Sequence, residues 1–176
     1  LLAALNERSL ASPRVRVVNE DAFVWLGASR GKFDVAVVDF PDPHNFALGK
    51  LYSQAFYRRL LAHLGSDGVA AVQSTSPLFA RQSFWCIVRT MEAAGFFARP
   101  YHANVPSFGE WGFVLASRTA LEPPRNPRPG LRSLDGPSLA SLFVIGPDMA
   151  RVEAEVNRLD NQVLVRTYET EWRHWN

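Results

Sequence analysis

An apolar run over residues 33–40 that leads into a pair of carboxylates is the strongest constraint on how this chain folds. The sequence there reads Phe33-Asp34-Val35-Ala36-Val37-Val38-Asp39-Phe40-Pro41-Asp42-Pro43. Such a run is typical of a strand buried on both faces of a parallel sheet, and we expect a central strand. Ligands of open α/β sheets bind beyond the carboxyl ends of the strands, where Asp39 and Asp42 would lie. This pair of carboxylates could hold a cationic amine.

Helical and strand-like patterns alternate along the rest of the chain. Leucines and aromatic residues recur at helical spacing over residues 50–64, and Gly65 follows as an end signal. Ser76 and Pro77 are typical of a helix start and Gly95 of a helix end, so a helix is predicted over 76–94. The remaining predicted elements are helices over 1–10 and 22–28, strands over 15–18 and 69–73, and an antiparallel pair of strands over 96–105 and 111–117 at one sheet edge.

The order of these elements predicts an α/β fold. Strands alternate with crossovers of helical length, which favours a doubly wound, mostly parallel sheet of the Rossmann-like type with an antiparallel edge hairpin. We assign residues 1–120 to this domain. Residues 121–137 are rich in proline and arginine and should run extended over the surface. Short helices over 138–143 and 147–157 should follow before an aromatic tail, so that 121–176 forms a linker and a helical extension packed on the sheet domain.

The sequence has no glycine-rich turn of the kind that normally opens a nucleotide-binding sheet over a helix N-terminus. It also starts at Leu1 within a helical pattern that has no N-cap. We therefore expect the N-terminal strands and the glycine-rich loop to precede residue 1 in a longer protein.

Composition excludes several classes of protein. The formal net charge is only +2 and the basic residues are scattered, so nucleic acid is not expected as a partner. The single cysteine, Cys86, excludes an internal disulfide and fits a reducing compartment, for which we expect the cytoplasm. The four histidines lack the spacing of metal ligands, and no metal is expected. No segment approaches the roughly 20 apolar residues of a membrane-spanning helix.

Several ordered landmarks resemble the aminopropyltransferases, the family of spermidine synthase. The family's strand ending in D-x-x-D-P is similar to residues 37–43, and its next helix is similar to Gly49-Lys50-Leu51-Tyr52 with Phe56-Tyr57. Gln73, Ser76-Pro77 and the hairpin over 105–113 match later landmarks. Asn45-Phe46 and the tail from Pro147 through Asn157 to Trp172 resemble a bacterial branch whose members often carry an N-terminal membrane-spanning region, which could associate the whole protein with a membrane. The resemblance implies the C-terminal part of the catalytic domain.

The resemblance implies transfer of an aminopropyl group from decarboxylated S-adenosylmethionine, the co-substrate, to the polyamine putrescine. An alkylamine with a pKa of about 10 is almost entirely ammonium at neutral pH, so a carboxylate must bind it and accept its proton. Asp39 matches the family's catalytic position. The substrate-binding positions implied by the resemblance are Asp42, Gln73, Phe108, Glu110 and Trp111, and many relatives have tyrosine at the position of Phe108.

The nucleoside end of the donor is expected near Asn19-Glu20-Asp21-Ala22. This segment resembles the family motif in which an acidic residue, followed by alanine or glycine, receives the adenine amino group. Asp21 and Ala22 are therefore the implied donor-binding residues. Many methyltransferases share this mode, so the motif supports adenosine binding better than it supports aminopropyl transfer.

Other interpretations stay open at this point. The residues alone allow Asp39 and Asp42 to be turn-forming, Asp21 to be an N-cap and Gln73 to satisfy backbone groups. The alternative functions are an S-adenosylmethionine-dependent methyltransferase and a noncatalytic relative that binds nucleoside or polyamine. We expect weak or no catalysis by these 176 residues alone, and a homodimer because an exposed sheet edge favours association.

Overall fold

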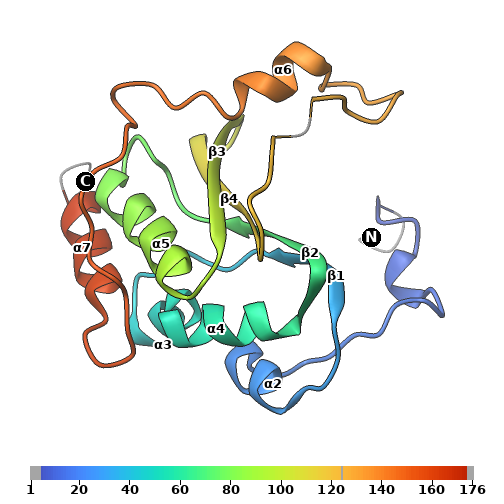
Figure 1. Cartoon of the computed structure of the whole chain (residues 1–176), viewed down its shortest axis with the longest axis horizontal. Coiled ribbons are helices and arrows are strands. Elements are labelled where there is room, and N and C mark those ends of the chain that lie inside the picture. Colours follow the sequence, from blue (N-terminus) through green and yellow to red (C-terminus); the bar gives the residue numbers. More distant parts are fainter. Residues whose placement is uncertain (1–4, 124, 174–176) are drawn as a thin grey trace.

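Four strands form one mixed sheet in the computed structural model, which describes residues 5–123 and 125–173 (Figure 1). They are β1 (Phe33–Val38), β2 (Leu64–Gln73), β3 (Phe97–Val105) and β4 (Gly109–Ser117), in the spatial order β1-β2-β4-β3. β1 and β2 are parallel, whereas β4 is antiparallel to both β2 and β3. Three of the four strands therefore run in one direction, and the predicted α/β class with an antiparallel edge hairpin is confirmed.

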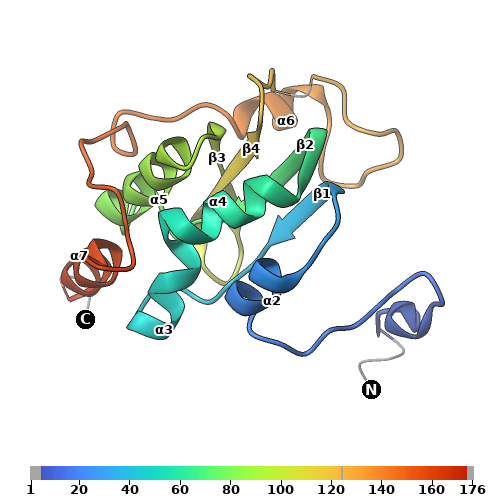
Figure 2. The same cartoon turned by 60° about the horizontal axis from the view of Figure 1, so that its bottom comes forward.

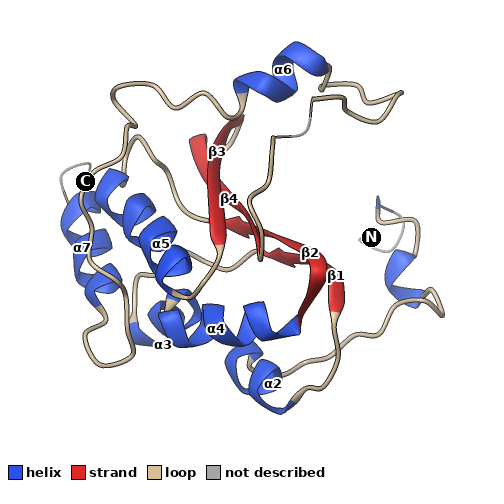
Figure 3. Ribbon diagram, viewed as in Figure 1, coloured by secondary structure: helices blue, strands red, loops and turns tan. Residues whose placement is uncertain are grey.

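The helices pack mainly on one face of this sheet (Figure 2). α4 (Gln54–His63) connects β1 to β2, and α5 (Arg81–Ala93) connects β2 to β3. α2 (Ala22–Ala28) contacts α4, and α7 (Val163–Trp172) contacts α5. The shorter elements, shown with the rest in Figure 3, are the helices α3 (Phe46–Gly49) and α6 (Gly136–Ser141) and the 3₁₀ helices η1 (Ser9–Ala11) and η2 (Lys50–Tyr52).

The hydrophobic core lies between the sheet and this helix layer. Ala70 and Val72 of β2 pair with Ala116 and Val114 of β4, and all four side chains are fully buried. Since alternate residues of a strand face opposite sides, these four residues define the helix-covered face. The helices contribute aromatic and aliphatic side chains to the same cluster, namely Phe56, Tyr57, Leu60, Phe84, Ile87, Val88 and Met91.

β1 is an edge strand in the described chain, so the prediction of a central strand is wrong here. Val35 is 62% exposed and Val37 is 76% exposed on the face opposite the helices. Residues 15–18, predicted as a strand, have no regular secondary structure and pair with no described strand, and the blue N-terminal segment runs to the side of the sheet in Figure 1. A β-branched pattern favours extended backbone, but a strand also requires a partner for its ladder of hydrogen bonds.

Three predicted helices have different bounds in the structure. The helix predicted over 50–64 is interrupted at Ser53, whose hydroxyl accepts from the Phe56 amide and caps α4. The helix predicted over 76–94 begins only at Arg81, because residues 76–80 form a turn in which the Ser76 hydroxyl accepts from backbone amides. Gly95, with φ of +105°, ends α5 as predicted. Of the helix predicted over 1–10, residues 1–4 lie outside the described residues and only η1 and an adjoining turn are seen.

The C-terminal region differs most from the sequence-based expectation. α6 confirms the helix predicted over 138–143, shifted by two residues and capped by Asp135. The helix predicted over 147–157 is wrong, because residues 151–158 run extended along α5. Side chains of α5 donate to backbone carbonyls of this segment: Gln82 Nε2 to Glu153 O at 2.5 Å and Cys86 Sγ to Glu155 O at 3.2 Å. α7 occupies much of the expected aromatic tail, and residues 174–176 lie outside the described residues.

Asn157 connects four segments at the end of this extended stretch. Its side-chain amide donates to Gly49 O at 3.0 Å, and its side-chain oxygen accepts from the Leu164 amide at 3.3 Å. Its backbone amide donates to the Thr90 hydroxyl at 2.9 Å, and its carbonyl accepts from the Gln54 amide at 2.9 Å. The side chain is fully buried, so its amide group supplies hydrogen bonds to the Gly49 carbonyl and the Leu164 amide where water does not reach.

Replacing Asn157 with alanine should lower the free energy of unfolding by about 2–4 kcal/mol, because it leaves the Gly49 carbonyl and the Leu164 amide buried without partners. Urea unfolding of the variant measures this loss. Asn104→Ala, at an exposed position of β3, is the matched control and should stay within about 0.5 kcal/mol of the wild type. Equal losses in the two variants would contradict the role of Asn157 as a connector.

Candidate active site

A cleft of about 710 Å³ opens at the carboxyl ends of β1 and β2. Asp39 and Asp42, from the loop after β1, line it together with Gln73, the last residue of β2. The hairpin between β3 and β4 forms the opposite wall. The full lining is Val37, Val38, Asp39, Phe40, Pro41, Asp42, Ala71, Gln73, Tyr101, Val105, Phe108, Trp111 and Phe113.

The loop after β1 is held in place by the buried hydroxyl of Tyr52. This oxygen lies 3.1 Å from Phe40 O, 3.1 Å from Pro41 O and 3.1 Å from the side-chain oxygen of Gln73. The ring of Phe40 packs edge-on against Tyr52 and Phe56. The ends of β1 and β2 are therefore connected through the side chain of Tyr52.

Asp42 accepts hydrogen bonds from three side chains. Gln73 Nε2 donates to Oδ1 at 3.2 Å, and the Tyr168 hydroxyl donates to Oδ2 at 2.7 Å. The Thr75 hydroxyl donates to Oδ2 at 3.4 Å. Both carboxylate oxygens thus act as acceptors, which is the pattern that an ionised carboxylate offers.

Both tyrosines of this network remain protonated donors at neutral pH. Burial raises the pKa of Tyr52 far above its ordinary value, and the nearby charges of Asp42 and Asp39 raise it further. Burial is also the main cause of the raised pKa of Tyr168, followed by its hydrogen bond to Asp42. The Tyr52 hydroxyl therefore keeps its proton and remains a hydrogen-bond donor to the loop. The Tyr168 hydroxyl likewise remains a donor to Asp42.

Thr75 adopts a strained backbone conformation beside this network. Its φ is +61° and its side chain is fully buried. A β-branched residue in the left-handed region costs about 1–3 kcal/mol, and such residues cluster at functional sites. Thr75 O accepts from the Gly112 amide at 2.7 Å, and a Cβ at Gly112 would lie only 2.5 Å from the Phe84 ring. The backbone here is thus fixed from two sides, and the Thr75 hydroxyl is directed at Asp42.

Asp39 differs from Asp42 in its surroundings. Its side chain is exposed in the cleft, and no hydrogen bond or ion pair from the described residues reaches its carboxylate. Asp42, in contrast, is half-buried and held by three donors. The Asp42 carboxylate is therefore held in one orientation, while the Asp39 carboxylate is free to accept a proton or a hydrogen bond.

The remaining predicted substrate-binding residues, on the hairpin between β3 and β4, do not all face the cleft. Phe108 and Trp111 pack against each other with tilted rings, whose centroids lie 5.2 Å apart, and both line the cleft. The Glu110 carboxylate instead pairs with His102 on β3 and lines neither this cleft nor the cavity next to it. The Glu110 backbone carbonyl accepts from the Ser76 hydroxyl at 2.6 Å. The structure brings Phe108 and Trp111, but not the Glu110 carboxylate, toward Asp39.

Asp21 caps α2 at a distance from this network. Its Oδ1 accepts from the amides of Phe23 at 2.8 Å and Val24 at 3.3 Å, and Oδ2 pairs with Lys50 Nζ at 2.5 Å. The hydrogen bond from Lys50 is the main cause that lowers the pKa of Asp21. Asp21 therefore has the structural role of an N-cap, and Ala22 is the first residue of the helix.

A second cavity of about 450 Å³ adjoins the cleft on the far side of Asp42. It shares Asp42, Phe108 and Trp111 with the cleft and is otherwise lined by Phe79, Ser107, Tyr168 and Trp172. Tyr168 and Trp172 were not singled out as site residues from the sequence. Their spacing with Leu164 and Val165 is that of one helix face, which could have indicated a packed helix but not its contact with Asp42.

Two features are absent from the described residues, 5–123 and 125–173. No group of three or more histidine, cysteine, aspartate or glutamate side chains there is arranged to hold a metal ion. None of the helices in that part of the chain has the length and apolar character needed to cross a bilayer.

Tyr52→Phe should lower the free energy of unfolding by about 1–3 kcal/mol, because it removes the one donor that the carbonyls of Phe40 and Pro41 and the side-chain oxygen of Gln73 share. Chemical denaturation measures the change. Tyr57→Phe is a matched control, since the buried Tyr57 hydroxyl has no hydrogen-bond partner among the described residues and its removal should be close to neutral. A Tyr52 variant as stable as this control would argue against a stabilising connection between the ends of β1 and β2 through the Tyr52 hydroxyl.

Relatives with curated descriptions are similar to nearly the whole chain. A polyamine aminopropyltransferase of Ralstonia nicotianae is 50% identical over 173 residues, which is 97% of this chain and 34% of that protein. The polyamine aminopropyltransferase of Leptospira interrogans is 50% identical over 172 residues, or 98% of this chain and 34% of that protein. The chain thus spans about a third of the length of these relatives.

Solved structures with the same fold include two spermidine synthases. One, in complex with the transition state analogue AdoDATO, superposes with a TM-score of 0.67 at 22% identity, covering 82% of this chain and 54% of that chain. The enzyme from Thermotoga maritima superposes with a TM-score of 0.65 at 20% identity, covering 82% of this chain and 53% of that chain. These likenesses establish the fold.

The model of the spermine/spermidine synthase domain matches residues 2–125. This range contains β1 to β4, the two carboxylates after β1 and the hairpin that faces them. Since the match covers most of the chain, the chain belongs to the spermine/spermidine synthase family.

Proposed function

We propose that the protein containing this chain transfers an aminopropyl group from decarboxylated S-adenosylmethionine to putrescine, giving spermidine and methylthioadenosine. The observation that carries this proposal is the convergence of Asp39, Asp42 and Gln73 in one cleft at the ends of two parallel strands. Family membership and the names of the relatives support it. A site with two carboxylates and aromatic walls suits a linear cationic amine.

The proposed reaction is a displacement at carbon. The amine nitrogen forms a bond to the aminopropyl methylene carbon next to sulfur, and the bond from that carbon to sulfur breaks. Sulfur takes the bonding electron pair and becomes a neutral thioether. The donor is already activated as a sulfonium, so the protein must align the two reactants and keep the attacking nitrogen unprotonated.

Asp39 is the proposed general base. Its carboxylate lines the cleft without a partner among the described residues, so it can accept the proton that the attacking nitrogen loses. Asp42, held by Gln73 and Tyr168, would bind the other end of the amine as an oriented acceptor. Gln73 would contact the amine from the strand end, and Phe108 and Trp111 would enclose its alkyl chain.

Asp21 and Ala22 are the proposed contacts to the adenine of the donor. The Asp21 carboxylate is 41% exposed, so an exocyclic amino group could still reach it beside Lys50. A direct role of Glu110 in the amine tunnel is not part of this proposal, because its carboxylate pairs with His102. The wider assignments stay predictions: a cytoplasmic location, a homodimer, and a division into a sheet domain over 1–120 and a linker with a helical extension packed on it over 121–176.

Asp39→Asn should lower kcat for spermidine formation by about 100- to 10,000-fold, because the amide cannot accept a proton. The protein expressed from its complete reading frame is assayed by mass detection of spermidine and methylthioadenosine. Asp34→Asn, on the same strand and exposed outside the cleft, is the control and should keep wild-type turnover. Unchanged turnover in the Asp39 variant would remove the assigned base, and methylated amine as the product would favour a methyltransferase.

Asp21→Asn should raise the KM for decarboxylated S-adenosylmethionine about tenfold and leave the KM for putrescine unchanged. Asparagine caps a helix as well as aspartate does, so α2 should persist while the charge toward the adenine amino group is lost. Lys50→Gln is the control, because it breaks the ion pair but keeps the carboxylate. If both variants raise the donor KM equally, Asp21 acts through Lys50 and not through adenine.

A further inference from the structure

The cavity beyond Asp42 has an unusual lining. Five aromatic side chains surround it, and Asp42 is the one charged side chain among its described lining residues. Phe79 packs against Trp172 at 6.5 Å between ring centroids, and Tyr168 packs against Trp172 at 5.8 Å. Aromatic faces attract organic cations, and a carboxylate at the entrance adds an opposite charge. The cavity is thus suited to an alkylammonium group.

α7 supplies two of these aromatic residues and is firmly anchored. The Glu171 carboxylate accepts from the backbone amides of Gln82 at 2.6 Å and Ser83 at 3.0 Å, and from the Ser83 hydroxyl at 2.6 Å. Asn157 accepts from the Leu164 amide at the other end of the helix. Both ends of α7 are therefore held, so the positions of Tyr168 and Trp172 between them are well defined.

The donors around Asp42 limit how it can bind a further group. A carboxylate has about four acceptor positions, and three are already taken by Gln73, Thr75 and Tyr168. The bond from Tyr168 is the shortest of the three, at 2.7 Å. About one acceptor direction is left, so the three donors together determine from which side an ammonium group can approach.

We propose that α7 forms the distal half of the acceptor site, with Tyr168 positioning the Asp42 carboxylate and Trp172 bounding the space beyond it. The ligand class is a linear diamine or polyamine whose nonreacting end carries a protonated nitrogen. This inference rests on the proposed function for the identity of the reaction, but not for the binding of the amine. Trp172 thereby sets the length of acceptor that the cavity admits.

Tyr168→Phe tests the positioning role in the protein expressed from its complete reading frame. The variant removes one hydroxyl and keeps the ring, so it should raise the KM for putrescine about tenfold, with kcat and the donor KM within about twofold of wild type. Calorimetric titration with putrescine should give a similar loss of affinity and needs no turnover. Tyr57→Phe, whose hydroxyl is unpartnered and outside both cavities, should change neither value.

Trp172→Ala tests the length limit. Removing the indole should raise kcat/KM for spermidine relative to that for putrescine at least tenfold, because the space beyond Asp42 grows. Trp25→Ala, which removes an indole that stacks on Phe33 away from both cavities, is the control. If Trp172→Ala lowers the melting temperature strongly, Trp172→Phe takes its place and should shift the same ratio in the same direction.

The outcomes separate this inference from the proposed function. Absence of spermidine with wild-type protein, together with putrescine binding that Tyr168→Phe weakens, would refute aminopropyl transfer and support the acceptor site. Spermidine formation with an unchanged putrescine KM in Tyr168→Phe would overturn the positioning role alone. An equal rise in the donor and acceptor KM, an unaltered length preference in the Trp172 variants, or no diamine binding by the wild type would also overturn the inference.

Discussion

The hydroxyl of Tyr52 is the contact on which the arrangement of the cleft depends. It joins two carbonyls of the loop after β1 to Gln73 at the end of β2, and Gln73 in turn donates to Asp42. A parallel pair of strands brings their carboxyl ends to one edge, but it does not fix the side chains that follow. The phenol does so from a buried position where its proton is retained.

The carboxylates of Asp39 and Asp42 differ in how the surrounding residues hold them. Asp42 is restrained by donors from β2, from the strained turn at Thr75 and from α7, whereas Asp39 faces the cleft without such partners among the described residues. Restraint suits a group that must recognise a fixed charge, and freedom suits a group that must change its protonation during a reaction. The difference arises from packing around the loop, since both residues follow the same strand.

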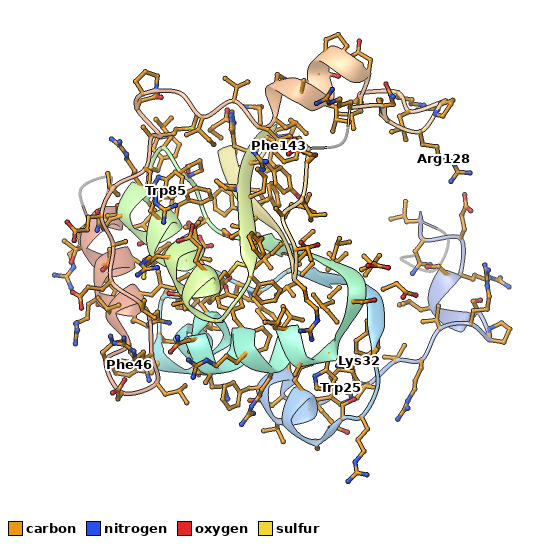
Figure 4. The ribbon with its side chains drawn as sticks, in the orientation of Figure 1. Trp25, Lys32, Phe46, Trp85, Arg128 and Phe143 are labelled. Carbon is orange, nitrogen blue, oxygen red and sulfur yellow. The ribbon has the colours of Figure 1, made fainter. Side chains whose placement is uncertain are left out.

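The sequence was sufficient to place the two carboxylates, Gln73 and the edge hairpin, because short-range patterns and strand order decide these features. It could not reveal Tyr168, since only tertiary packing brings this residue to Asp42 across 126 positions of the chain. The helix predicted over 147–157 failed for a related reason: α5 side chains hold that backbone extended. β1 looked central because a continuous apolar run is typical of a strand covered on both faces, whereas Val35 and Val37 are exposed on one face of the described chain. Trp85 and Phe143, both labelled in Figure 4, contact residues distant in sequence, since Trp85 donates to Met149 O and Phe143 packs on Tyr101 of β3.

Glu171 makes α5 and α7 a single cooperative unit. Its carboxylate satisfies two first-turn amides of α5 from another helix, so α7 cannot detach by local unfolding without exposing those amides to solvent. Slow hydrogen exchange at Gln82 and Ser83, positions that usually fray, would then report the docking of a helix at the far end of the chain. Core stability and the completeness of the cavity wall beyond Asp42 are thereby linked through one side chain.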